Sequence, residues 1–203
     1  MTLEATSRAI RRAEPAESRP RLEVRGKFFF AGEDKVPLRG VTYGPFAPDA
    51  NGFRYPAPEV VERDLSLIVE LGANCLRLFT PPPRWLLDMA ADRGLWVLVG
   101  IPWAQHVCFL DSEEITDTVR HAVTDVVVAC QGHPAVGAFL VGNEIPPDIV
   151  RWYGAQRITG FLRELVSLIK RIEPNTPVGY ANFPSTEYLE TDFTDFLAFN
   201  VYL

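Results

Sequence analysis

The sequence is poor in cysteine and histidine. Three cysteines, Cys75, Cys108 and Cys130, stand far apart in apolar surroundings, with no paired or metal-type spacing. We therefore expect reduced thiols that face the core, as in a cytoplasmic protein. The three histidines are scattered as well, and without a His/Cys cluster the sequence predicts no metal site. Nothing in it indicates another cofactor.

Long apolar runs and an excess of positive charge are also missing. No segment approaches the ~18 continuous apolar residues of a membrane span. Residues 1–20 are rich in Arg, Glu, Ala and Ser and lack the apolar run of a secretory signal, so we expect a disordered leader there and a single domain over 21–203. We expect no membrane contact from this segment and a cytoplasmic location. The net charge of −6 argues against nucleic acid as the main partner, because phosphate binding needs clustered Lys and Arg.

Strands and helices alternate along most of the chain. Residues 22–31 and 36–41 are typical of a β-hairpin followed by a strand, with a turn at 32–35. Alternation implies parallel βαβ units with right-handed crossovers. Apolar residues at three- and four-residue spacing predict helices, and short apolar runs predict strands. The predicted helices are 57–71, 84–93, 112–130 and 147–172, and the later strands are 73–79, 95–101, 136–141, 177–180 and 196–201.

Two architectures fit this order, a doubly wound open sheet and an eight-stranded barrel. No Gly-x-Gly-x-x-Gly follows the first strand, which removes the best reason for a dinucleotide-binding sheet. Polar residues instead follow the carboxyl ends of successive strands, where barrel enzymes build their sites. We therefore predict an α/β fold of the (β/α)8 TIM-barrel type, truncated after about six strands, with an N-terminal β-hairpin. The 203 residues are fewer than the ~250 of a typical barrel, so we expect the chain to continue into further domains beyond Leu203.

The residues after the predicted strands favour a carbohydrate ligand. Aromatic faces stack on sugar rings, amides hydrogen-bond to hydroxyls, and a carboxylic acid can protonate a leaving oxygen. Aromatic, amide and carboxylic acid side chains all occur at the strand ends, together with an arginine and a histidine. These residues are Tyr43, Arg77, Trp103, His106, Asn143, Glu144, Asn182, Asn200 and Tyr202.

Glu144 is the sharpest candidate for catalysis, because it stands where a buried strand emerges at the cavity. Desolvation there favours the protonated form of a carboxyl, as a general acid requires. The alternative is a structural glutamate that complements the dipole of the helix beginning at Pro147. His106 could bind a sugar hydroxyl or order its own loop. His133, beside a proline at the start of a strand, is expected to be structural, and His121 to lie exposed on a helix.

The context of Glu144 resembles a known family. His133-Pro-Ala-Val136, followed by Gly142-Asn-Glu144, is similar to the fourth-strand signature of the glycoside hydrolase clan with paired catalytic glutamates, in particular the barrel of family 2. Asn74-Cys-Leu-Arg77 resembles that barrel's second strand and Arg93-Gly-Leu-Trp-Val97 its third. Asn200-Val-Tyr202 resembles its sixth. The similarity covers about residues 22–203.

This resemblance implies a retaining mechanism with two glutamates. Glu144 would be the acid/base, and Asn143 would hydrogen-bond to the sugar 2-hydroxyl. Arg77 would lie under the site and keep the nucleophile ionised, and Tyr202 would touch that nucleophile. From the residues alone, Arg77 could instead form an ion pair at the rim, and Tyr202 could be a capped core tyrosine. Substrate contacts are expected from Tyr43, Trp103, His106, Asn182, Glu187 and Asn200.

The nucleophile of this clan comes from a seventh strand, which we expect beyond Leu203. We therefore expect the 203-residue chain to be inactive by itself. A looser resemblance, over 25–30, 41–45 and 183–188, is to bacterial proteins with a hydrolase-like barrel ahead of a processive glycosyltransferase. It implies a β-glucan as the carbohydrate partner. The alternative function is a non-catalytic carbohydrate-binding or regulatory module of such a polysaccharide-synthesising protein.

Overall fold

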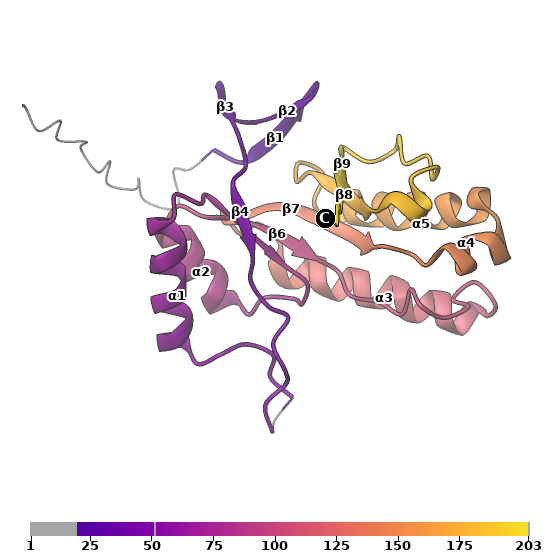
Figure 1. The fold of residues 1–203 in the computed structure, drawn as a ribbon, viewed down its shortest axis with the longest axis horizontal. Coiled ribbons are helices and arrows are strands. Elements are labelled where there is room, and N and C mark those ends of the chain that lie inside the picture. Colours follow the sequence, from indigo (N-terminus) through magenta and orange to yellow (C-terminus); the bar gives the residue numbers. More distant parts are fainter. Residues whose placement is uncertain (1–19, 51, 203) are drawn as a thin grey trace, which may run out of the picture.

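The computed structural model describes residues 20–50 and 52–202 of the chain, and the leader expected over 1–20 lies outside these residues except for Pro20. Two sheets are present (Figure 1). One is an antiparallel sheet of β1 (Leu22–Arg25), β2 (Phe28–Ala31) and β3 (Asp34–Val36). The other has six parallel strands in chain order, namely β4 (Gly40–Thr42), β5 (Cys75–Leu78), β6 (Trp96–Gly100), β7 (Val136–Asn143), β8 (Val178–Asn182) and β9 (Phe196–Phe199).

The helices connect the parallel strands and cover the outer face of their sheet (Figure 1). Consecutive strands are neighbours throughout, and the sheet curls into half a barrel. The prediction of an α/β fold of the TIM-barrel type with an N-terminal hairpin is therefore confirmed. In the part of the chain that the structure describes, no helix combines the length and the apolar character needed to span a membrane. The helices are α1 (Pro58–Glu70), α2 (Arg84–Asp92), α3 (Glu113–Cys130), α4 (Pro147–Tyr153) and α5 (Ala155–Ile172), with a short 3-10 turn, η2, at Pro184–Thr186.

Two of the predicted elements are divided in the structure. The prediction of a single helix over 147–172 is wrong. Gly154 adopts a φ of 82° and separates α4 from α5. A left-handed residue cannot continue an α-helix, and glycine adopts that conformation without a steric cost. The strand predicted over 36–41 is also divided. Val36 ends β3, which pairs with β2, and the barrel strand β4 begins only at Gly40, after Pro37.

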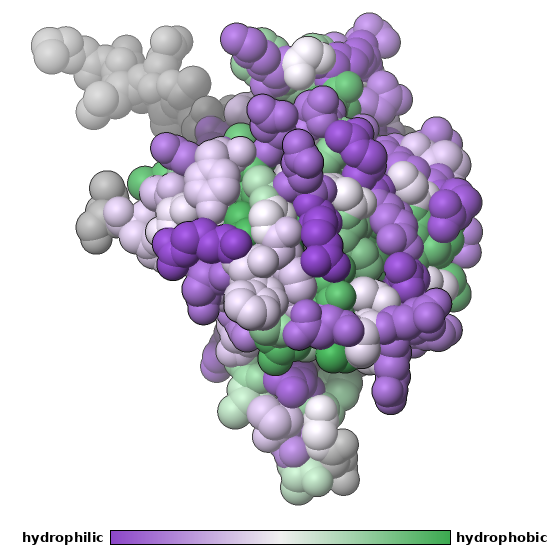
Figure 2. Space-filling view, turned by 90° about the vertical axis from the view of Figure 1, so that its right-hand side faces the viewer, coloured by the Kyte–Doolittle hydropathy of each residue, from purple (hydrophilic) through white to green (hydrophobic). Residues whose placement is uncertain are grey.

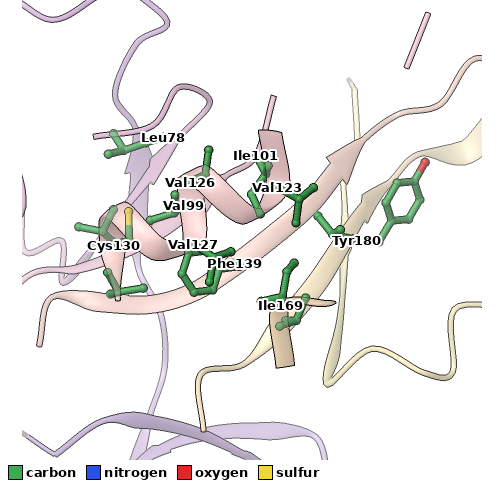
Figure 3. Packing of buried hydrophobic residues seen from close by; sticks show 14 of the residues in the cluster. Leu78, Val99, Ile101, Val123, Val126, Val127, Cys130, Phe139, Ile169 and Tyr180 are labelled. Atoms are coloured by element: carbon green, nitrogen blue, oxygen red, sulfur yellow. The ribbon is translucent and has the colours of Figure 1, made fainter. Parts of the chain in front are cut away.

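The core lies between the parallel sheet and its helices. Alternate residues of the strands face the helices, as period-2 geometry requires, and are fully buried, such as Leu76 and Leu78 of β5. Figure 3 shows Val127 of α3 beside the strand residue Phe139. None of the three cysteines forms a disulfide; Cys75 and Cys130 are buried and Cys108 is half-buried.

The antiparallel sheet packs against the amino-terminal end of the half-barrel. Leu22 of β1 is buried and lies so close to Gly137 that a Cβ on residue 137 would approach its Cδ1 to 2.9 Å. Phe29 packs edge-on against Phe196 of β9, with ring centroids 5.1 Å apart. An apolar plug thus occupies this end, and the polar strand-end residues gather at the opposite, carboxyl end.

Replacement of Phe139 by alanine tests how strongly this core supports the half-barrel. We expect Phe139→Ala to lower the free energy of unfolding by about 3–5 kcal/mol, because the ring is fully buried and its removal leaves a cavity. Val128→Ala is the control, because Val128 is 54% exposed on α3 and should change the free energy by less than about 0.5 kcal/mol. Urea denaturation measures both, and equal effects would contradict this description of the core.

Candidate functional site

A hollow of about 280 Å³ opens at the carboxyl ends of β5, β6 and β7. Trp103 forms part of its wall, with its indole N–H donating to the Val141 carbonyl at 2.7 Å and its ring packing edge-on against Phe109 at 4.9 Å. These contacts fix an aromatic surface beside the strand ends. The lining residues are Arg77, Phe79, Gly100, Ile101, Pro102, Trp103, Gln105, His106, Leu140, Gly142 and Asn143.

The guanidinium of Arg77 joins three strand ends. Its Nη1 donates to Asn200 Oδ1 at 2.7 Å and its Nη2 to Asn143 Oδ1 at 2.6 Å. Burial lowers the pKa of Arg77, and the nearby Glu144 opposes this shift. Its Nε is buried and has no acceptor among the described residues. The Phe79 ring lies 4.6 Å from the guanidinium carbon, so the cation is held between an aromatic face and two amide oxygens.

The carboxylate of Glu144 lies beside this group, in the residue that follows Asn143. Its Oε1 accepts a hydrogen bond from Asn200 Nδ2 at 2.6 Å and another from the hydroxyl of Tyr202. Its Oε2 has no hydrogen-bond donor among the described residues. The hydrogen bond to Glu144 raises the pKa of the Tyr202 phenol. A half-buried carboxyl with one oxygen occupied and the other available can carry a proton to a ligand or take one from it.

Glu144 also has an unusual backbone. Its φ is 53°, and among the described residues it is the one non-glycine with a positive φ. This conformation costs of order 1–3 kcal/mol and persists only when the surroundings impose it. The Glu144 N–H donates to the Ala181 carbonyl at 2.9 Å. The next N–H, of Ile145, donates to the Tyr180 hydroxyl at 3.0 Å, and the preceding one, of Asn143, donates to Gln105 Oε1 at 3.0 Å.

Gln105 and Tyr180 were not predicted as site residues, although both hold the turn at Glu144. Tyr180 is fully buried on β8, and burial raises its pKa to about 12. A hydroxyl in an otherwise apolar strand was the available signal, because a buried tyrosine usually finds a hydrogen-bond partner. Gln105 gave no comparable signal, since a glutamine in a loop between two aromatic segments is typical of an exposed residue.

The structure brings together five of the predicted residues, Arg77, Asn143, Glu144, Asn200 and Tyr202. Trp103 and His106 line the adjoining hollow. One contact differs from expectation, because the Tyr202 hydroxyl donates to Glu144 itself. The predicted contact between Tyr202 and a nucleophile stays a prediction.

Three predicted substrate contacts lie outside this group. The hydroxyl of Tyr43 donates to Asp64 of α1 at 3.0 Å. The side chain of Asn182 is 1% exposed and hydrogen-bonds to Thr186 and to the Phe183 N–H within its own loop. Glu187 borders a different hollow, with Leu197 on its wall. Tyr43 and Asn182 therefore hydrogen-bond to residues outside the group around Arg77, and Glu187 lies at another hollow.

The histidines and acidic residues form no candidate metal centre. Within 20–50 and 52–202, no group of three or more His, Cys, Asp or Glu side chains is arranged to hold an ion. His133 is buried, lies 2.9 Å from Asp88 through Nε2 and accepts the Ala135 N–H through Nδ1 at 3.1 Å. These contacts of His133 hold the segment at the start of β7 in place. His121 is exposed on α3.

Comparison with known protein families found no family profile that matches this chain. Among curated proteins, the chain is 24% identical over 199 residues to the 1,3-beta-glucanosyltransferase gel1 of Aspergillus fumigatus, which covers 89% of the chain and 44% of that protein. It is 26% identical over 178 residues to the 1,3-beta-glucanosyltransferase PGA4 of Candida albicans, covering 82% of the chain and 39% of that protein. The chain therefore spans less than half the length of these relatives.

Solved structures with the same fold include bacterial beta-glucuronidases. A beta-glucuronidase of Bacteroides uniformis matches with a TM-score of 0.74 and 23% identity, over 91% of this chain and 23% of that one. The beta-glucuronidase of Ruminococcus gnavus matches with a TM-score of 0.74 and 18% identity, over 91% of this chain and 32% of that one. This chain therefore has a glycoside hydrolase-like fold of the TIM-barrel type, and its similar curated proteins are transglycosylases.

Proposed function

We propose that this chain carries the acid/base half of a retaining site that cleaves or transfers the glycosidic bonds of a β-1,3-glucan. The observation that carries the proposal is the Glu144 carboxylate, which keeps one oxygen available beside the polar group of Arg77, Asn143 and Asn200. The choice of β-1,3-glucan is supported by the two 1,3-beta-glucanosyltransferases that resemble this chain.

In this mechanism the proton moves on Oε2 of Glu144. Asn200 and Tyr202 both donate to Oε1, so Oε2 is the atom that delivers the proton to the glycosidic oxygen as the bond to the anomeric carbon breaks. The same oxygen then takes a proton from the acceptor hydroxyl, of water or of a second glucan, when the sugar is released. The amide oxygen of Asn143 is already used by Arg77, which leaves its Nδ2 to donate to the sugar 2-hydroxyl.

The second carboxylate of this mechanism is a glutamate that we expect beyond Leu203. A retaining mechanism needs two carboxyl groups ~5–5.5 Å apart, one of which forms the covalent glycosyl intermediate. Arg77 fits the role of its counter-ion, because its buried Nε has no acceptor among the described residues and a guanidinium holds a nearby carboxylate ionised. The expected link to a glycosyltransferase domain likewise stays a prediction about sequence beyond this segment.

Replacement of Glu144 by glutamine tests the acid/base role. We expect Glu144→Gln in the full-length protein to lower kcat/KM on β-1,3-glucan by about 10²–10⁴-fold, because the amide cannot transfer the proton. Glu187→Gln is the matched control. The Glu187 carboxylate borders a different hollow, so the turnover of Glu187→Gln should equal that of the wild type. Chromatography of the glucan oligosaccharides that are released or transferred over time measures these rates.

Full turnover by Glu144→Gln, with an unchanged melting temperature, would contradict the acid/base role. A similar loss in Glu187→Gln would instead place the essential carboxylate on the loop after β8.

Removal of the Tyr180 hydroxyl tests whether the turn at Glu144 depends on its hydrogen bonds. We expect Tyr180→Phe to lower the free energy of unfolding by about 1–3 kcal/mol, because the buried Ile145 N–H loses its acceptor. Turnover should fall as well, since the carboxylate loses its position. Tyr188→Phe is the control, because Tyr188 is 53% exposed. Guanidinium denaturation and the glucan assay measure the two effects, and wild-type values for both in Tyr180→Phe would contradict the role of this hydroxyl.

The alternative function is a non-catalytic carbohydrate-binding or regulatory module. One observation favours it, namely that no Asp or Glu lines the hollow among the described residues. Isothermal titration with β-1,3-glucan oligosaccharides, followed by product analysis, separates the two functions. Binding without bond cleavage in the full-length protein favours the binding module, whereas cleavage or transfer that needs Glu144 favours the enzyme.

A further inference from the structure

A second hollow, of about 370 Å³, opens at the carboxyl ends of β4 and β5. We call it the β4–β5 hollow, because it lies between the loop that follows β4 (43–57) and the start of the loop that follows β5 (79–83). In Figure 1 the first of these loops is the long purple segment that descends from β4. The lining residues are Gly52, Phe53, Arg54, Tyr55, Thr80, Pro81, Pro82 and Pro83.

Aromatic side chains form one wall of this hollow. Phe53 is 40% exposed, and its ring centroid lies 6.3 Å from that of Tyr55 and 6.4 Å from that of Trp85. The Phe53 and Trp85 rings are inclined by only 36°. They therefore present an aromatic surface of the kind on which the apolar face of a sugar ring stacks.

Hydrogen bonds hold the two loops in this arrangement. The Tyr55 hydroxyl donates to the Thr80 carbonyl at 2.6 Å and accepts from Thr80 Oγ1 at 3.0 Å. Within the first loop, the Phe53 N–H donates to Asp49 Oδ1 at 2.8 Å, and the Asp49 N–H donates to the Phe53 carbonyl at 2.8 Å. Three consecutive prolines, with fixed φ, form the opposite wall. A wall fixed in this way loses little conformational entropy when a ligand binds.

Arg54 supplies a polar group at the same place. Its side chain is exposed and makes no hydrogen bond or ion pair with the residues that the structure describes. A guanidinium carries five donors, and hydroxyl oxygens are suitable acceptors. An aromatic face beside donor groups fits a sugar better than a purely apolar ligand. The lower projection in Figure 2, which contains the 43–57 loop, likewise mixes apolar and weakly polar residues.

Consecutive residues of the chain line the two hollows. Phe79 lines the first hollow, and the next residue, Thr80, lines the second. Both hollows lie at the carboxyl ends of the parallel strands, and β4 and β5 are neighbours in the sheet. The two hollows therefore lie at the same edge of the sheet, as the binding of one linear oligosaccharide to both would require.

We propose that the β4–β5 hollow is a further sugar subsite, in which one glucose ring of a β-1,3-glucan chain stacks on Phe53 and hydrogen-bonds to Arg54. This inference rests on the proposed function, because it places the subsite on the same glucan chain. It predicts that the protein binds longer glucan oligosaccharides more tightly than short ones. It also predicts that this gain in affinity depends on Phe53.

Isothermal titration of the full-length protein with a β-1,3-linked glucose disaccharide and hexasaccharide tests the proposal. We expect Phe53→Ala to weaken hexasaccharide binding by about tenfold and to leave disaccharide binding unchanged. Phe53→Leu, which keeps an apolar side chain in the loop, should give the same loss if stacking is the cause. Phe28→Ala is the matched control, because Phe28 is 48% exposed on β2, in the sheet at the amino-terminal end. It should bind both ligands like the wild type.

The outcomes separate this inference from the proposed function. Equal hexasaccharide affinity in the wild type and both Phe53 variants would overturn the subsite, and the proposed function would stand if Asn143→Ala weakened both ligands. A loss with Phe53→Ala but not with Phe53→Leu would also overturn it, because the effect would then arise from loop packing. Binding of neither sugar by the wild type would overturn both proposals.

Discussion

The half-buried guanidinium of Arg77 is the constraint on which the carboxyl end of the half-barrel depends. A cation removed from water must find hydrogen-bond acceptors, and here these are the amide oxygens of Asn143 and Asn200. The three residues come from or follow β5, β7 and β9, so their contacts require those strand ends to converge as the sheet curls. Asn200 then donates to Glu144. The position of the carboxylate is therefore a consequence of how the cation is accommodated.

The two ends of the half-barrel differ in what they tolerate. At the amino-terminal end, Leu22 packs on Gly137 and the antiparallel sheet covers the strands. At the carboxyl end, the chain accepts a positive φ at Glu144. The backbone N–H groups of residues 143–145 maintain it by donating hydrogen bonds to neighbouring segments. Apolar packing thus covers one end, and the other end carries the strained residue, the polar group, the hollow beside Arg77 and the β4–β5 hollow. This division is common in barrel enzymes, whose sites are built from loops on a stable scaffold.

The fold could be predicted from the sequence because hydrophobic periodicity reports burial directly, and the order of strands and helices then restricts the topology. The grouping of Arg77, Asn143 and Asn200 followed from the same order, since all three stand at strand ends. Conformations imposed by single residues were harder to predict. Gly154 could have continued a helix, and its left-handed φ depends on the packing of α4. Glu187 stands after β8, but which hollow it borders could not be predicted, because periodicity does not encode the direction in which a loop turns. The Tyr180 hydroxyl on β8 accepts the N–H of Ile145, the residue after Glu144. Such a contact depends on the register in which β8 pairs with β7, which the sequence pattern does not give.

The most direct measurement of the central claim, that Glu144 transfers the proton to the leaving oxygen, is the dependence of kcat/KM on leaving-group acidity. A series of aryl β-glucosides with leaving groups of graded pKa would be compared between the full-length wild type and Glu144→Gln. The proposed role predicts that the variant loses most activity on poor leaving groups and little on the best ones, since only the former need protonation. A uniform loss across the series, or none, would contradict it.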